Sequence, residues 1–395
     1  MMTENVHNFD AWIRSRFCEL NTALENLYFA QERRADVAGV GSDLKRALCL
    51  EGQEHIRKLV QEGNTDEGFD QAFNLLGNVG FYMAACNRHG VTEQDAGPAA
   101  QMREASALAL ELGANLGVTP RFATSHLTTH NFALQGRYKS FTSLEDEYIF
   151  IDYNTIGILA YKRAADALLR LQPMGVTHPV ATSLLRAAKA ALDEVIESNA
   201  ELFKKLDVER FFYSVRPYYK PHAVGFQVYR GANAGDFAGI NVIDLLLGLC
   251  QSRQSSYSQL LVDKFLFMMP NEQLILRDCM RQPNYMDLFL QALDAGHDSP
   301  AFRRNLALFV QVCQAHGQGS SMHHDQLVHK YIAKPADDLP PENHDKLTAS
   351  GPPLPVLLRA LQNLRDQRAA VQRDDIPTRY ADLQRLQATL AAWEK

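Results

Sequence analysis

Apolar residues recur every three to five positions along most of the chain, with polar residues between them. This spacing is typical of helices that bury one face. Gly90 follows one such stretch and predicts its left-handed cap, and Thr119 with Pro120 predicts the start of another helix. No run alternates apolar and polar residues between regular turns, so we expect an all-α protein with little sheet. The pattern predicts helices over residues 11–28, 71–86, 102–116, 156–171, 179–202, 240–251, 271–281, 284–295, 301–315, 354–372 and 377–393.

The helical pattern is interrupted at two places. It breaks over residues 139–147, which predicts a smaller N-terminal helical domain at 1–145 and a large C-terminal helical bundle at 146–395. A Pro-rich segment follows at 335–355. Loops of this length are uncommon in compact proteins and often functional, so we expect a surface loop there.

Composition narrows the classes of function. A formal charge of -6 and the absence of a basic run argue against nucleic acid and anionic lipid as partners. The apolar stretch 242–250 is too short to span a membrane and contains Asp244. The six cysteines are scattered, without paired spacing, and the N-terminus lacks the pattern of a signal peptide. We therefore expect a cytoplasmic protein with reduced thiols and no membrane partner.

A histidine pair, His323 and His324, introduces an apolar helix. Residues 317–321 are glycine and serine with one glutamine, and predict a flexible approach with a serine cap. His324 shares the apolar face of the helix, whereas His323 falls off it. A single imidazole on an apolar face is what a haem iron requires, while zinc would need a second ligand three or four residues away. A lone histidine on such a face is more often a packed core residue, and that alternative stays open. The apolar residues that share the face of His324 are Leu327, Val328 and Tyr331.

A second stretch, residues 211–217, combines aromatic side chains with an Arg-Pro pair. Phe211 and Phe212 offer walls for a flat aromatic ligand, and the planar guanidinium of Arg216 matches a carboxylate. The alternative is that Arg216 pairs with a structural carboxylate at a helix end. His222 follows a proline and is assigned to the surface. The chain shows neither a carboxylate pair nor a nucleophile motif, so no catalytic residue is assigned beyond a cofactor.

Taken in order, these stretches resemble the indoleamine/tryptophan dioxygenase superfamily of histidine-ligated haem enzymes. Residues 211–216 resemble the segment that supplies aromatic pocket residues and the arginine for the substrate carboxylate. Residues 228–231, 236–239 and 244–248 resemble the block that follows, and 324–332 resemble the helix of the proximal haem ligand.

Within this superfamily, further stretches are similar to the monodechloroaminopyrrolnitrin synthase family, whose enzymes act on chlorotryptophan in the pyrrolnitrin pathway. The likeness is colinear from about residue 75 to residue 365. The stretches that carry it are residues 80–82, 88–90, 105–118, 125–131 and 216–221.

The resemblance implies an all-helical oxygenase of secondary metabolism, with a large C-terminal bundle enclosing a haem pocket and the N-terminal domain contributing to its distal side. It implies haem b (iron protoporphyrin IX) ligated by His324, and dioxygen as co-substrate. It also implies that Arg216 binds the carboxylate of a small aromatic amino acid, tryptophan or a derivative. Phe211, Phe212 and Gly239 would surround the ring. An electron donor is a further expected partner, and the assembly expected is a monomer or homodimer.

Three positions qualify this expectation. Gly239 runs directly into residues 240–242, so the polar loop that the dioxygenases carry there is shortened. Ser321 stands where the indoleamine enzymes have a basic residue, three positions before the ligand. Both departures favour a divergent reaction or substrate over ordinary opening of the tryptophan ring. His126 has a counterpart in the pyrrolnitrin enzymes and is assigned either to the substrate side of the pocket or to a helix cap.

Two other classes stay open. A non-catalytic, all-helical haem-binding or interaction protein would have kept the fold and lost the substrate pocket, and the shortened region at Gly239 is the feature that allows it. A metal-free helical scaffold would bind no haem at all.

Overall fold

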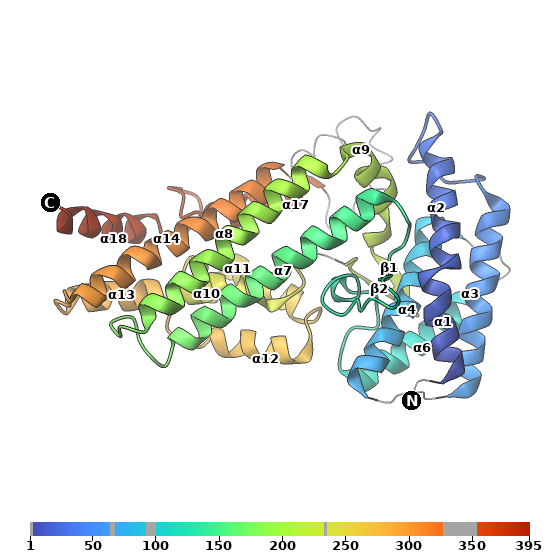
Figure 1. Ribbon diagram of the computed structural model, residues 1–395, viewed down its shortest axis with the longest axis horizontal. Helices are drawn as coiled ribbons and strands as arrows, with labels where there is room; N and C mark the ends of the chain where they lie inside the picture. Colours follow the sequence, from blue (N-terminus) through green and yellow to red (C-terminus); the bar gives the residue numbers. More distant parts are fainter. Residues whose placement is uncertain (1–2, 64–67, 92–99, 233–234, 327–353) are drawn as a thin grey trace. The chain divides into compact units, whose positions relative to one another are not determined.

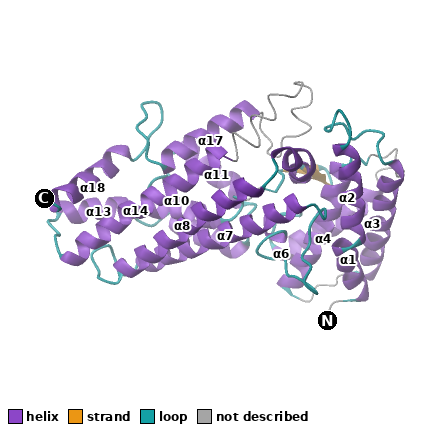
Figure 2. Cartoon of the chain, turned by 45° about the horizontal axis from the view of Figure 1, so that its top comes forward, coloured by secondary structure: helices purple, strands orange, loops and turns teal. Residues whose placement is uncertain are grey.

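The computed structural model describes residues 3–63, 68–91, 100–232, 235–326 and 354–395. Regular structure in these ranges is almost entirely helical, which confirms the predicted fold class (Figure 2). The only sheet in the described ranges is an antiparallel hairpin of β1 (His222–Val224) and β2 (Gln227–Tyr229). None of the helices described there combines the length and apolar character needed to cross a membrane.

The chain forms two compact units. The first contains Met1–Asp152, Lys205–Asp236 and Tyr331–Leu354, and the second contains Tyr153–Lys204, Phe237–Lys330 and Pro355–Lys395. The division into domains after residue 145 stays a prediction.

The first unit is built around one buried helix, α4 (Phe69–Arg88), which packs against three other helices, α1, α3 and α6 (Figure 1). Almost every residue of α4 from Ala72 to Cys86 is buried. As predicted, α4 ends before Gly90, whose positive φ of 59° lets Val91 N–H reach back to the Cys86 carbonyl at 3.0 Å. The other elements of this unit are α1 (Glu4–Arg14), α2 (Arg16–Phe29), α3 (Ser42–Glu62), α6 (Ala100–Leu116), η1 (Thr124–His126), α9 (Val208–Arg210), the π-helical η2 (Phe211–Val215) and η3 (Arg216–Tyr219).

The second unit is a bundle with one continuous apolar core, to which most of its helices contribute. α7 (Glu145–Leu171) begins in the first unit and continues through the second. Within the bundle α14 packs against α18, and α10 packs against α12 and α13. The remaining elements are α8 (Ala181–Lys205), α10 (Ala238–Leu247), α11 (Ser255–Phe265), α12 (Pro270–Cys279), α13 (Tyr285–Asp294), α14 (Pro300–Met322), α17 (Leu354–Arg368) and α18 (Tyr380–Trp393).

The single helix predicted over 11–28 is wrong, because the chain breaks at Ser15. Ser15 has φ −130° and ψ −92°, and its hydroxyl donates to the Ala11 carbonyl at 2.7 Å. A serine side chain that bonds the backbone in this way competes with the helical ladder. Two helices of the structure, α3 and α11, were missed from the sequence.

The helix predicted to start at Thr119 and Pro120 is also absent. Residues 119–123 are non-helical and lie across α4 instead. A Cβ at Gly80 would come within 2.7 Å of the Phe122 backbone, and one at Gly77 within 2.5 Å of the His126 ring. The two glycines therefore admit this segment against α4, and that tertiary contact overrides the local helix signal.

The flexible approach predicted at 317–321 is a third correction. These residues form the last turns of α14, which is capped at its start by Ser299, whose hydroxyl accepts from Phe302 N–H at 3.2 Å. Helix packing overrides the loop preference of these small residues, since Gly317 lies against α17 where a Cβ would meet Ala369 Cα at 2.8 Å. The predicted loop 335–355 lies outside the described residues except for its last two positions, which begin α17.

Candidate functional site

Arg216 lies at the junction between η2 and η3 and is buried. The π-helical turn of η2 and the Pro217 that follows set the orientation of its side chain. Its guanidinium carbon lies 5.6 Å from the centre of the Phe212 ring. Burial lowers the pKa of Arg216 to about 10, so the group remains a cation at neutral pH.

Buried polar contacts from α2 and α4 hold this segment in place. The Arg88 guanidinium makes a bidentate ion pair with Glu25 at 2.8 and 2.9 Å and donates to the Tyr213 carbonyl at 2.8 Å. His89 accepts from the Tyr28 hydroxyl at 3.0 Å through Nδ1, and its Nε2 lies 3.4 Å from the hydroxyl of Tyr218 in η3. These contacts fix the backbone around Arg216 from helices far away in the sequence.

The two phenylalanines predicted to wall a ligand have different neighbours. Phe211 is buried against Phe150, with ring centres 4.9 Å apart, whereas Phe212 lies edge-on to Tyr213 and beside Arg216. Phe150 also contacts the Tyr219 ring at 5.7 Å. The first unit therefore brings Phe211 into a continuous aromatic group, and it brings Phe212 next to the cation.

His126 is completely enclosed, and both of its ring nitrogens bind backbone groups. Nδ1 accepts from Ala123 N–H at 3.0 Å, and Nε2 donates to the Phe73 carbonyl at 3.0 Å. Burial and the nearby Lys139 place the pKa of His126 well below its ordinary value, so the ring is neutral. The bond to Ala123 is a cap on η1, the second of the two predicted roles. A role for His126 in substrate binding stays a prediction.

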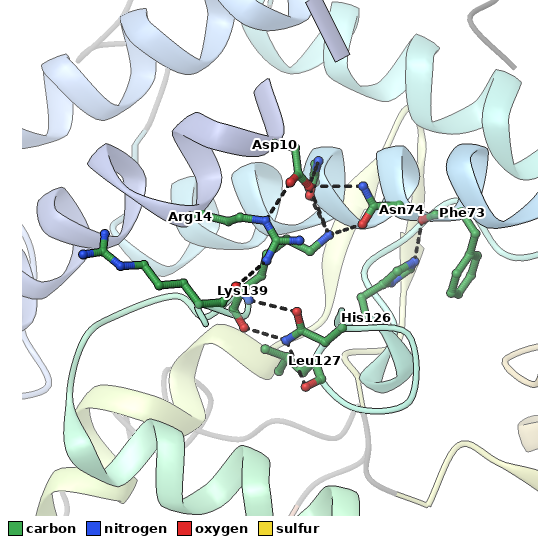
Figure 3. A network of polar contacts seen from close by, with 10 residues as sticks. Asp10, Arg14, Phe73, Asn74, His126, Leu127 and Lys139 are labelled. Atoms are coloured by element: carbon green, nitrogen blue, oxygen red, sulfur yellow. Dashed lines mark hydrogen bonds and ion pairs between the residues drawn. The ribbon is translucent and has the colours of Figure 1, made fainter. Parts of the chain in front are cut away.

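A buried polar cluster lies close to His126 in the same unit (Figure 3). Lys139 Nζ donates to Asn74 Oδ1 at 2.6 Å and to Asn78 Oδ1 at 2.8 Å, and lies 3.7 Å from Asp10 Oδ1. Burial lowers the pKa of Lys139 to about 8. The cluster fastens the segment around residue 139 to α1 and α4, which is a structural role.

Gly239 belongs to the second unit, in the first turn of α10. A Cβ at this position would lie 2.7 Å from the Phe237 ring, so the glycine makes room for that ring. The helix begins at Ala238, so the block after residue 236 passes directly into α10, as the shortened loop predicted.

His324 also belongs to the second unit, on a π-helical turn of residues 323–326 that continues α14. Its side chain is 17% exposed, whereas His323 is open to solvent, which agrees with the predicted orientation of the pair. His324 Nδ1 lies 3.2 Å from Asp325 Oδ1, and Asp325 also accepts from Arg365 Nη1 of α17 at 3.3 Å. The apolar partners predicted for His324, at positions 327, 328 and 331, lie outside the described residues.

This arrangement fits a haem ligand. An imidazole that bonds a carboxylate through Nδ1 presents the lone pair of Nε2, which is the usual second-sphere arrangement of metal-binding histidines. Groups of three or more His, Cys, Asp or Glu side chains suited to a metal ion are absent from the described residues. A haem requires only one imidazole from the protein.

The sequence-based assignments missed a charged cluster on Asp244 of α10. This carboxylate is buried and accepts from His316 Nε2 at 2.7 Å, from Arg368 Nη2 at 2.7 Å and from the Tyr257 hydroxyl at 2.8 Å. Burial pushes the pKa of Asp244 upward, but Arg368 and His316 outweigh it and hold the pKa well below its ordinary value. The charge inside the apolar run 242–250 was the available signal.

The Asp244 cluster and Asp325 together tie α17 to the end of α14. Arg365 and Arg368 lie one turn apart on α17, and they bind Asp325 and Asp244 respectively. His316 on α14 binds the same Asp244. The turn that carries His324 is therefore held by polar contacts both at Asp325 and two turns earlier.

The structure thus divides the predicted site residues between the two units. Arg216, Phe211, Phe212 and His126 belong to the first unit, and Gly239 and His324 to the second. Within the first unit Arg216 and Phe212 are neighbours, while His126 is joined to backbone groups of α4 and η1.

The chain matches a known protein family over nearly its whole length. The family described as monodechloroaminopyrrolnitrin synthase PrnB matches residues 3–390, nearly the whole chain. That family lies within the haem superfamily of the tryptophan and indoleamine dioxygenases, as the sequence predicted. The chain therefore belongs to the monodechloroaminopyrrolnitrin synthase PrnB family and is an enzyme of the haem-dependent oxygenase class.

Proposed function

We propose that this enzyme holds haem b through His324 and oxygenates tryptophan or a tryptophan derivative in secondary metabolism. Family membership supports the reaction class. The single observation that supports the ligand is the pairing of His324 Nδ1 with Asp325 at 3.2 Å, since it directs the lone pair of Nε2 outward.

Haem, when bound, supplies the iron chemistry that activates dioxygen. The chain's own contribution is binding and orientation. In this proposal the Arg216 guanidinium binds the substrate carboxylate, and Phe211 and Phe212 restrain the aromatic ring. The burial of all three side chains excludes water from these contacts. Because the ring of an indole is itself electron-rich, no general base is assigned.

The ligand assignment is tested by substituting the two adjacent histidines separately. The variant His324→Ala should lose haem, because it removes the nitrogen proposed to bind the iron. The variant His323→Ala should keep it, because His323 is solvent-exposed and makes a matched control. Haem occupancy is measured from the ratio of Soret to protein absorbance after reconstitution, and from the carbon monoxide spectrum of the reduced protein. Equal loss of haem in both variants would contradict the assignment.

Substrate binding is tested by a separate measurement. Titrating the reduced, haem-loaded protein with L-tryptophan should shift the Soret band, because a haem oxygenase binds its substrate close enough to the iron to perturb the haem spectrum. A haem-loaded protein that shows no shift with tryptophan or chlorotryptophan would instead be the non-catalytic haem-binding protein that the sequence left open.

A further inference from the structure

The hydroxyl of Tyr219 is an unexplained polar group in the first unit. Tyr219 is 7% exposed, and its hydroxyl has no hydrogen-bond partner among the described residues. Leaving a buried hydroxyl unpaired is unfavourable, and such groups are uncommon in folded proteins. The adjacent Tyr218 differs, because its hydroxyl lies 3.4 Å from His89 Nε2.

The surroundings of Tyr219 are aromatic. Its ring centre lies 5.7 Å from that of Phe150 and 6.3 Å from that of Phe122. Phe150 in turn contacts Phe211 at 4.9 Å, the residue proposed to restrain the substrate ring. A ligand ring held by Phe211 would therefore lie in the same aromatic group as the Tyr219 ring.

The charge state of the hydroxyl limits its partner. Burial, together with the nearby Glu147, raises the pKa of Tyr219 well above its ordinary value, so the phenol stays neutral. Tryptophan offers a carboxylate, an ammonium and an indole N–H. The carboxylate is assigned to Arg216, and an ammonium is poorly solvated by a neutral phenol among phenylalanines. The indole N–H is the group that a neutral oxygen in an aromatic surround accepts best.

We infer that Tyr219 is a specificity-determining residue whose hydroxyl oxygen accepts a hydrogen bond from the indole N–H of the substrate. The inference rests on the proposed function, because it takes a tryptophan-like substrate as given. It adds a residue that none of the predicted roles includes, next in sequence to one whose hydroxyl is already used inside the protein.

The variant Tyr219→Phe removes only the hydroxyl and keeps the ring. Calorimetric titration of the haem-loaded full chain should show the Kd for L-tryptophan rising about tenfold, as expected for one buried hydrogen bond. The Kd for the tryptophan analogue with sulfur in place of the indole N–H should not change, since that analogue has no proton to donate. The melting temperature of the haem-free variant should be unchanged or higher, because an unpaired hydroxyl is removed.

Tyr218→Phe is the matched control. This variant should lower the melting temperature, since its hydroxyl pairs with His89, and should leave the ratio of the Kd values for tryptophan and its sulfur analogue unchanged. If the wild-type protein binds tryptophan and Tyr219→Phe binds it equally well, the inference is overturned and the proposed function stands. An equal weakening of both ligands also overturns it. Absence of tryptophan binding by the wild-type protein overturns both.

Discussion

At the scale of single residues, burial separates structural polar groups from candidate binding groups. His126 and Lys139 are buried, and their polar atoms are paired within the protein. His126 accepts from a backbone N–H and donates to a backbone carbonyl, and Lys139 donates to two side-chain amide oxygens. The Tyr219 hydroxyl is equally enclosed but has no such partner among the described residues. Paired polar groups of this kind have a structural role, whereas an unpaired one is a candidate for binding a ligand.

Arg216 provides the test of carboxylate binding. Replacing it by leucine should raise the Kd for tryptophan about 10- to 100-fold, the cost of a lost charge-assisted hydrogen bond. The Kd for tryptamine, which lacks the carboxylate, should change little. The haem spectrum of the variant should match that of the wild-type protein.

Arg210 makes a suitable control for this substitution. It lies in the same segment, but its guanidinium donates to Asn26 Oδ1 at 3.0 Å and stacks on Phe29. Arg210→Leu should leave the Kd for tryptophan unchanged. If Arg216→Leu weakens tryptophan and tryptamine to the same extent, the arginine shapes the site without binding the carboxylate.

At the scale of elements, most helices were predictable from apolar periodicity and the connections were not. The buried face of α4 and the Gly90 cap can be read from the sequence, because the residues that determine them are neighbours in the chain. The fate of Thr119 and Pro120 depends on Gly77 and Gly80, about forty residues earlier, which admit the segment against α4. Local preference cannot report such a contact.

The candidate site shows the same limit. The types and order of residues around Arg216 and His324 were sufficient to suggest a haem enzyme, and the family match confirms that class. The cluster of Asp244 with His316 and Arg368 was not predictable, because its members come from three helices and no spacing rule joins them. Only the isolated charge at Asp244 hinted at it.

The close approach at Gly80 can be tested by substitution. Gly80→Ala places a Cβ 2.7 Å from the Phe122 backbone, which cannot move without displacing η1. The variant should therefore lose about 1–3 kcal/mol of unfolding free energy. The control is Gly157→Ala in α7, where the nearest atom to the new Cβ is Ser198 Oγ at 3.8 Å.

Gly157→Ala should instead be neutral or gain up to about 1 kcal/mol, because alanine is the better helix former. Thermal and urea unfolding followed by circular dichroism measure both changes. Equal behaviour of the two variants would mean that the segment at residue 122 adjusts to the added methyl group without cost.

At the scale of the whole molecule, buried titratable groups set how stability depends on pH. In the first unit, burial places the pKa values of His89 and His126 well below 6.5, and lowers that of His222 to about 4. The sequence context of His222 suggested a surface residue. That prediction is wrong, because His222 is buried. Each of these histidines is neutral in the folded state and takes up a proton on unfolding below pH 6.5.

Glu147 acts in the opposite direction. Its carboxylate is buried and accepts from Phe141 N–H at 2.6 Å and Thr142 N–H at 2.7 Å, and burial raises its pKa from 4.5 to about 7. It is therefore protonated in the folded state below pH 7 and releases a proton on unfolding between pH 4.5 and 7. Its contribution to stability is fully present below pH 4.5 and is lost as the pH rises through 7.

Between pH 5 and 6.5 these three histidines outweigh the glutamate, so unfolding of the first unit should take up roughly two protons near pH 5 and roughly one near pH 6.5. Its unfolding free energy should therefore rise by roughly 3 kcal/mol in total over this range. Trp12 lies in the first unit and Trp393 in the second, and the chain has 2 tryptophans. Urea unfolding of a Trp393→Phe variant, followed by Trp12 fluorescence, therefore reports on the first unit alone.

The variant Glu147→Gln tests the part that the glutamate plays. It removes the opposing proton, so the rise between pH 5 and 6.5 should increase to roughly 5 kcal/mol, whatever the absolute stability of the variant. A flat profile between pH 5 and 6.5 would show that the buried histidines are already protonated in the folded protein. The neutral hydrogen-bonding pattern assigned to His89 and His126 would then be wrong, because a protonated ring cannot accept through Nδ1.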